Sequence, residues 1–234
     1  MNMKRGILLS VIYAVIILSF LAVTNLTSAV VTGAVQRAPL ERSHTIIIDP
    51  GHGGVDGGAT SVSGIPESTY NLQIALKLRD VFHLLGYRTE MIRTTDDSVY
   101  TQGNTIAEKK VSDLKQRVKI VNETENAILV SIHQNYFSDR RYSGAQIFYG
   151  AKGESKPLAD LLQTAFRATL NVESKRNAKK AEGIYLMEQI NCTGILVECG
   201  FLSNQEEEAE LRSEEYQKKI CCVIASTVGI FLTK

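Results

Sequence analysis

The chain has 234 residues, with 26 lysine and arginine residues against 25 aspartate and glutamate residues, and it contains no tryptophan. A charge balance this close to neutral argues against nucleic acid as a partner, because nucleic-acid binding normally leaves a basic footprint. The length fits one domain with a substantial core, and no internal repeat is visible.

The N-terminal segment, residues 1–36, differs from the rest of the chain. Residues 6–36 carry no charged side chain, and Lys4 and Arg5 precede this run. A membrane-spanning helix needs about 20 predominantly apolar residues, and a positive flank orients such a helix. We therefore expect an export signal that places the remaining chain outside the cytoplasmic membrane. The small residues at 27–29 and 32–34 would suit cleavage of a signal peptide, but the length of the apolar run favours a retained signal anchor.

Residues 37–44 are interpreted as a short linker, and a single domain is expected from residue 45 to residue 232. Without Lys4 and Arg5 the chain keeps 24 basic and 25 acidic residues, so its net charge identifies no partner.

Apolar runs and helical periodicities alternate along this domain. Apolar runs predict strands at 45–48, 87–92, 127–132, 144–149, 184–187 and 194–199. Helical spacing of apolar residues predicts helices at 68–85, around 111–121 and at 158–170, and two more helices that close the chain. The longest irregular segment, 94–110, is expected to form a mobile rim. The alternation indicates an α/β fold in which a mostly parallel central sheet carries helices on both faces.

Reactive side chains follow three of the predicted strands. His52 comes shortly after the first strand, His133 follows the third, and Glu198 lies within the last. Ligands of such sheets bind outside the carboxyl ends of the strands, so these side chains are expected at one edge of the sheet. Glu67, at the start of the first long helix, could lie over the same edge.

Two imidazoles and one carboxylate make a three-ligand zinc site that leaves a fourth position for water. His52, Glu67 and His133 are therefore candidate ligands. Glu198 ends an apolar run, where an unpaired carboxylate is costly, and a metal-bound water beside it would explain its presence. The glycine-rich loop at 51–64 could instead bind phosphate at a helix N-terminus, although the Walker and dinucleotide-binding patterns are both absent.

The other two histidines, His44 and His83, belong to no motif, and His83 is expected at the surface or at the edge of the core. The chain also lacks His-Glu-x-x-His, His-x-x-x-His and Gly-x-Ser-x-Gly, which argues against other zinc peptidases, polysaccharide deacetylases and serine hydrolases.

Four motifs occur in order along the chain: DPGHGG at 49–54 with D at 56 and GGA at 57–59, E at 67 with NL at 71–72, SIHQN at 131–135, and VECGFLSN at 197–204. Together they resemble the zinc-dependent N-acetylmuramoyl-L-alanine amidases, and the resemblance spans residues 45–232. The short chain with an N-terminal apolar segment is most similar to the spore-cortex amidases, which are germination-specific and form muramic lactam.

The resemblance implies that His52, Glu67 and His133 bind one Zn²⁺ and that Glu198 is the catalytic carboxylate. The implied reaction is hydrolysis of the amide between N-acetylmuramic acid and L-alanine in peptidoglycan, with the spore cortex as the expected substrate. The alternative function is a catalytically silent wall-binding or regulatory domain of the same fold.

Two residues near His133 each have more than one interpretation. Asn135 could orient the substrate or the developing oxyanion, or it could hold its own loop. Tyr136 departs from the family, which usually has a small residue here, and its ring could narrow the cleft or stack on a sugar. No wall-binding repeat is visible, so localisation is expected to depend on the N-terminal segment or on an accessory exported protein.

The four cysteines and one acidic run are expected to have structural and not catalytic roles. Export would permit disulfides, but the surroundings of Cys199 and of the adjacent Cys221 and Cys222 favour thiols, and no Cys-x-x-Cys spacing supports metal ligation by Cys192 or the others. The glutamates at 206–208 are interpreted as a solvated helix face.

Overall fold

The structure is a computed structural model that describes residues 43–233. The expected anchor at 1–36 and most of the expected linker at 37–44 lie outside the described residues. Within 43–233, no helix combines the length and the apolar character needed to cross a bilayer.

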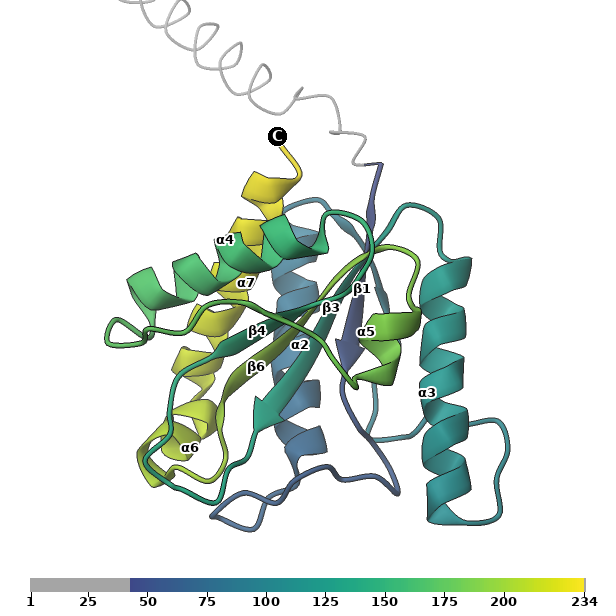
Figure 1. Cartoon of the computed structure of the whole chain (residues 1–234), viewed down its shortest axis with the longest axis horizontal. Helices are drawn as coiled ribbons and strands as arrows, with labels where there is room; N and C mark the ends of the chain where they lie inside the picture. The colour runs from purple at the N-terminus through teal and green to yellow at the C-terminus, as the bar shows by residue number, and fades with distance from the viewer. Residues whose placement is uncertain (1–42, 234) are drawn as a thin grey trace, which may run out of the picture. The chain divides into compact units, whose positions relative to one another are not determined.

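A six-stranded sheet forms the centre of the domain (Figure 1). Its strands are β1 (Thr45–Pro50), β2 (Arg88–Met91), β3 (Ala127–Asn135), β4 (Gln146–Tyr149), β5 (Lys179–Lys180) and β6 (Thr193–Phe201), in the order β2-β1-β3-β6-β4-β5. Strands β2, β1, β3 and β6 are mutually parallel. Strand β4 runs antiparallel to β6, and β5 runs parallel to β4. The predicted mostly parallel α/β sheet is therefore confirmed.

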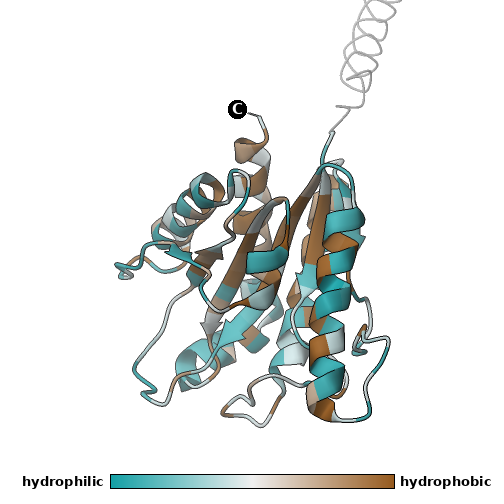
Figure 2. Ribbon diagram, turned by 45° about the vertical axis from the view of Figure 1, so that its right-hand side comes forward, coloured by the Kyte–Doolittle hydropathy of each residue, from teal (hydrophilic) through white to brown (hydrophobic). Residues whose placement is uncertain are grey.

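Helices cover both faces of the sheet. The helices are α2 (Glu67–Leu84), α3 (Ile106–Glu123), α4 (Ser155–Thr169), α5 (Tyr185–Gln189), α6 (Gln205–Arg212) and α7 (Glu214–Phe231). One core cluster joins α2, α4 and α7 to Ile46 and Ile48 of β1, and the other joins α3 and α5 to Ile47 of the same strand. Successive strand residues point to opposite faces, so a strand buried on both sides is apolar at successive positions, as the brown parts of the central strands in Figure 2 show.

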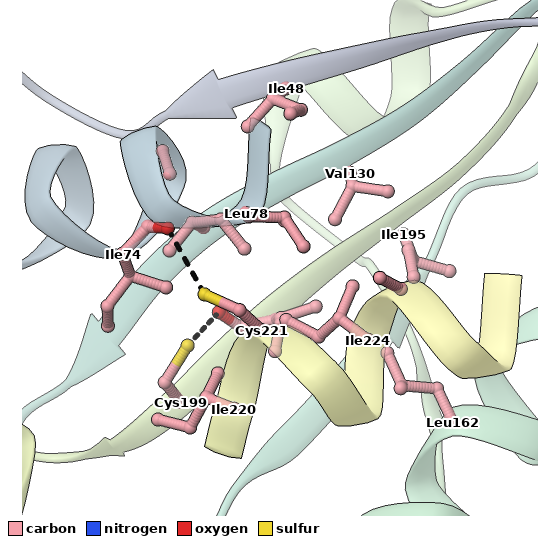
Figure 3. Close-up of a cluster of buried hydrophobic side chains, with 14 of the residues drawn as sticks. Ile48, Ile74, Leu78, Val130, Leu162, Ile195, Cys199, Ile220, Cys221 and Ile224 are labelled. Carbon is pink, nitrogen blue, oxygen red and sulfur yellow. Dashed lines mark hydrogen bonds between the residues drawn. The ribbon is translucent and has the colours of Figure 1, made fainter. Parts of the chain in front are cut away.

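Two cysteines lie inside the larger cluster. Cys199 of β6 and Cys221 of α7 are fully buried, and Figure 3 shows them beside Ile220 and Ile74. Their thiols donate to the backbone carbonyls of Val197 and Ile74. All four cysteines are free, and Cys222 is exposed on α7, which agrees with the thiol interpretation.

Three local predictions were wrong. Residues 185–189 form helix α5 instead of a strand at 184–187, since leucine, methionine, glutamate and glutamine all favour helices. The irregular segment expected at 94–110 ends earlier, because the side chains of Thr105 and Glu108 form a capping box that starts α3 at Ile106.

The third error concerns the glutamates at 206–208. Glu206 is exposed, but Glu207 and Glu208 are buried. Glu207 accepts hydrogen bonds from the backbone amides of Gly144 and Phe201, both at 2.8 Å. The acidic run is therefore only partly a solvated face, and its second and third members hold neighbouring loops.

Candidate active site

The structure brings His52, Glu67 and His133 together at the carboxyl edge of the parallel strands. One ligand atom from each side chain lies within 4.8 Å of the other two. Nε2 of His52 lies 3.3 Å from Oε2 of Glu67, and Nδ1 of His133 lies 2.9 Å from Oε1 of the same carboxylate. Two imidazole nitrogens and a carboxylate thus converge, which is the donor set of an open zinc site.

Each of the three side chains is placed by a different element. His133 stands near the end of β3, and His52 lies in the loop after β1 with a left-handed backbone, φ 59°. Glu67 is the first residue of α2, where its carboxylate accepts hydrogen bonds from the backbone amides of Ala59 and Gln134, both at 3.1 Å. The ligand set therefore depends on three segments that are distant in sequence.

Two glycines allow the ligands to approach the backbone closely. A Cβ atom at Gly51 would lie 2.1 Å from Nε2 of His133. At Gly58, which has φ +70°, a Cβ would lie 2.6 Å from Oε2 of Glu67 and 2.7 Å from Cδ2 of His52. A side chain at either position would collide with His133, Glu67 or His52, so this part of the glycine-rich loop leaves room for the three-residue cluster.

Two buried arginines hold the loop that carries His52. Arg93, just after β2, donates to the carbonyls of Pro50 at 2.8 Å and Gly51 at 3.0 Å. Arg117 of α3 donates to the carbonyls of Pro50 at 3.0 Å and His52 at 2.7 Å. Both side chains are nearly inaccessible. The sequence reasoning missed these arginines, and the only signal for Arg117 was a charge between apolar positions of the predicted helix.

Arg117 also forms a buried ion pair with Asp49 of the DPGHGG motif. Ser131 donates to the second oxygen of Asp49 at 2.6 Å. Burial acts to raise the pKa of Asp49, but the charge of Arg117 and the Ser131 hydrogen bond outweigh burial and hold that pKa below its ordinary value. Asp49 thus remains ionised and anchors the guanidinium beneath the loop.

His52 has a second carboxylate partner on its other ring nitrogen. Oδ2 of Asp56 lies 3.0 Å from Nδ1 of His52, and Nζ of Lys110 on α3 lies 2.7 Å from Oδ1 of Asp56. Burial disfavours the imidazolium, but the hydrogen bonds and charges of Glu67 and Asp56 outweigh it and raise the pKa of His52 to about 9. A carboxylate on the second nitrogen fixes the tautomer and orientation of a ligating histidine.

Glu67 is the electrostatic centre of the cluster. Burial acts to raise its pKa, but hydrogen bonds with His133 and His52 outweigh burial and hold the pKa well below its ordinary value. Asn71, one turn along α2, donates to Oε1 of Glu67 at 3.2 Å and to the carbonyl of Gly51 at 3.1 Å. The same helix therefore presents Glu67 and ties it to the loop of His52.

Glu198 lies next to His133 on the neighbouring strand. The register of β3 and β6 pairs His133 with Glu198. Oε2 of Glu198 is buried and has no hydrogen-bond partner within the described chain. Burial raises the pKa of Glu198 to about 7, and the negative charge of Glu67 acts in the same direction. A half-buried carboxylate whose inner oxygen has no partner, beside the His52, Glu67 and His133 cluster, is a candidate for proton transfer.

The remaining candidates lie at the rim. Asn135 ends β3, beyond a register shift after His133, and its side chain makes no hydrogen bond to any of residues 43–233. Tyr136 is 50% exposed and follows it at the same edge. His83 lies exposed on α2 and bonds Thr89, and His44 precedes β1, so neither joins the ligand cluster.

Comparisons with known proteins identify the family of this domain. The family profile described as N-acetylmuramoyl-L-alanine amidase matches residues 46–229. The germination-specific N-acetylmuramoyl-L-alanine amidase of Bacillus subtilis is 36% identical over 191 residues, covering 81% of this chain and 80% of that protein.

Solved structures show the same fold. The CwlD amidase from Clostridioides difficile, in complex with the GerS lipoprotein, has a TM-score of 0.77 and 36% identity and covers 81% of this chain and 98% of its own. An N-acetylmuramoyl-L-alanine amidase from Clostridium difficile 630 has a TM-score of 0.71 and 29% identity, with 83% and 99% covered. The enzymatic interpretation of the sequence is thereby supported over the silent one. The chain belongs to the N-acetylmuramoyl-L-alanine amidase family and is a peptidoglycan amidase.

Proposed function

We propose that this amidase is zinc-dependent, with His52, Glu67 and His133 as the zinc ligands. The observation that carries the proposal is the convergence of one ligand atom from each side chain within 4.8 Å. The donor set suits Zn²⁺, and Gly51 and Gly58 leave free the space that a Cβ would take from the ligands. The residues present therefore fit the metal.

We assign the proton transfers to Glu198. A bound Zn²⁺ supplies a Lewis acid that polarises the amide carbonyl and lowers the pKa of water. The carboxylate of Glu198 takes a proton from the attacking water and returns it to the leaving nitrogen of L-alanine, first as general base and then as general acid. A pKa raised by burial to about 7 suits both roles near neutral pH. Asp56 orients His52, and we propose that Asn135 orients the substrate.

The domain organisation, the location of the enzyme and its natural substrate are also proposed. We propose residues 1–36 as a signal anchor, 37–44 as a linker and 45–232 as the catalytic domain, with the enzyme exported and active on spore-cortex peptidoglycan. The germination-specific relative supports the cortex as substrate. The amidase from Clostridioides difficile is described in complex with a lipoprotein, which supports an accessory exported partner here.

The decisive experiment combines metal analysis with mass spectrometry of muropeptides. The purified full chain is expected to hold about one zinc per chain and to release peptides whose N-terminus is L-alanine. Glu198→Gln should keep the zinc and lose at least about a hundredfold in rate, whereas the matched control Glu206→Gln, at an exposed position, should keep both. Full activity in Glu198→Gln would overturn the assignment. Cleavage of vegetative and cortex peptidoglycan at equal rates would reject the cortex preference.

A further inference from the structure

A groove of about 1080 Å³ lies between two segments at the edge of the sheet where the site is found. The connection from β3 to β4 forms one wall, and the segment between α4 and β5 forms the other. The walls are joined by hydrogen bonds from Ala145 N to Oδ1 of Asn171, at 3.0 Å, and from Nε2 of Gln146 to the carbonyl of Asn177, at 2.8 Å. The groove is therefore built from two mutually bonded segments.

The groove begins in the same row of side chains as the catalytic groups. The strand registers pair His133 with Glu198 and Glu198 with Gln146, and Gln146 lines the groove. Residues paired directly across neighbouring strands point to the same face, and neighbouring strands lie about 5 Å apart. The three residues thus occupy one row on one face, and the buried Gln146 separates Glu198 from the groove by a single strand.

Basic side chains that form no ion pair within residues 43–233 line the groove. They are Lys175, Arg176 and Lys179. Of the ion pairs within residues 43–233, none involves these three cations. Lys179 of β5 pairs with Phe148 of β4, which lies two residues beyond Gln146 and on the same face. The charge of Lys179 is therefore on the face that carries Glu198.

Arg176 is held in place by the groove walls. Its guanidinium lies 5.1 Å from the centroid of the Phe201 ring and donates to the carbonyl of Ser143 at 3.3 Å. These contacts position the cation without neutralising it.

The acidic groups of the groove leave a positive surplus. Asp139 is paired with Arg141, and Glu207 is directed to backbone amides. The charge of Arg176 also acts to lower the pKa of Glu207. The groove lining carries four basic side chains against three acidic ones, Asp139, Glu173 and Glu207. The groove thus presents positive charge close to the catalytic row.

We propose that this groove is a subsite for the stem peptide, in which Lys175, Arg176 and Lys179 receive the peptide's free carboxylates. The inference rests on the proposed function of the site formed by His52, Glu67, His133 and Glu198. The scissile amide divides the substrate into a glycan side of uncharged N-acetylated sugars and a peptide side that carries carboxylates. A cationic groove complements the peptide side, because lysine and arginine form charge-assisted hydrogen bonds with carboxylates. The stem peptide therefore extends from Glu198 across β4 and β5.

The test compares two soluble muropeptides, one with free peptide carboxylates and one in which they are amidated. In the full chain, Lys175→Gln combined with Lys179→Gln should raise KM for the carboxylate substrate about three- to tenfold, with kcat nearly unchanged. The variant should leave KM for the amidated substrate as in the wild type. Added salt should shrink the difference between the two substrates in the wild type. The matched control is Lys180→Gln, since Lys180 is exposed, adjacent and on the opposite face of β5.

The outcomes separate the two proposals. If the wild type releases no L-alanyl peptide from either muropeptide, the proposed function fails. If the wild type cleaves both and the double variant behaves like Lys180→Gln, the amidase stands and the subsite is overturned. An equal rise in KM for both substrates also overturns it, because such a loss is independent of carboxylates. Loss of lipoprotein binding with unchanged KM would assign the cations to a protein partner instead.

Discussion

Gly51 lies against the imidazole of His133, so that a Cβ at position 51 would fall 2.1 Å from Nε2 and 2.3 Å from Cε1. The backbone at Gly51 is not left-handed, so the contact, and not the backbone dihedral, requires glycine. We predict that Gly51→Ala displaces His133 and weakens zinc binding at least about tenfold. A competition titration with a chelator measures this. The control is Gly229→Ala on α7, where the nearest atom is a tyrosine hydroxyl at 3.2 Å; equal zinc affinity in both variants would contradict the role of Gly51.

Asp56 is expected to matter through the orientation of His52. Asp56→Asn replaces the carboxylate that lies 3.0 Å from Nδ1 of His52, and zinc affinity should fall about tenfold, as for other carboxylate partners of ligating histidines. The same titration is applied to Asp97→Asn, an exposed change in the neighbouring segment, which should leave zinc affinity unchanged. Wild-type affinity in Asp56→Asn would show that the hydrogen bond does not orient the ligand.

The Asp49–Arg117 ion pair predicts a pH dependence of stability. Because the pKa of Asp49 is lowered in the folded state, its contribution is complete above the ordinary carboxyl pKa of about 4 and is lost as pH falls through the lower folded-state value. Asp49→Asn should cost about 2 kcal/mol in the free energy of unfolding at pH 7, because the buried Arg117 loses one of its two carboxylate partners and keeps only Asp113, which lies 2.6 Å from its Nε.

Urea denaturation of the metal-free protein over a range of pH tests the sign of this effect. The gap in the free energy of unfolding between wild type and Asp49→Asn should stay constant at neutral pH and narrow only in acid. The exposed control Asp80→Asn should change stability by less than about 0.5 kcal/mol at either pH. A gap that widens on acidification would contradict the assignment.

Glu208 provides a comparison within one acidic run. Tyr70 donates to its carboxylate at 2.5 Å and Ser63 at 3.1 Å. Glu208→Ala removes the acceptor of Ser63 and the shorter hydrogen bond of Tyr70, whose hydroxyl keeps only Ser61 at 3.1 Å. We expect a loss of about 2 kcal/mol in the free energy of unfolding. Glu206→Ala, two residues earlier and exposed, should cost less than about 0.5 kcal/mol. Thermal and urea unfolding of both variants measures the difference, and equal losses would refute the structural role of Glu208.

Much of the fold is predictable because its strands are buried on both faces. The runs at 45–48, 127–132 and 194–199 are apolar at successive positions, and this pattern identifies central strands of a parallel sheet. The run at 184–187 failed because four apolar residues are too short to separate a strand from a helical turn. Strand β5 has only two exposed lysines, so no hydrophobic pattern marks it.

The candidate ligands are predictable for a different reason. His52, His133 and Glu198 all stand at the carboxyl ends of strands, and topology alone brings such positions to one edge. The structural role of Arg93 and Arg117 could not be predicted from the sequence. A charged residue is expected at the surface unless its buried carbonyl and carboxylate partners are known. The burial of Glu207 and Glu208 escaped notice for the same reason.

Strand β4 runs against the direction of β3 and β6. The connection from Asn135 to Gln146 therefore leaves the sheet and returns to it at the same edge, the one that holds Glu198. A lengthened or shortened connection would reshape the approach to the reacting bond while every core strand keeps its register. Because β4 is antiparallel, the length of this connection can change which substrates reach the site while the packing of the core stays the same.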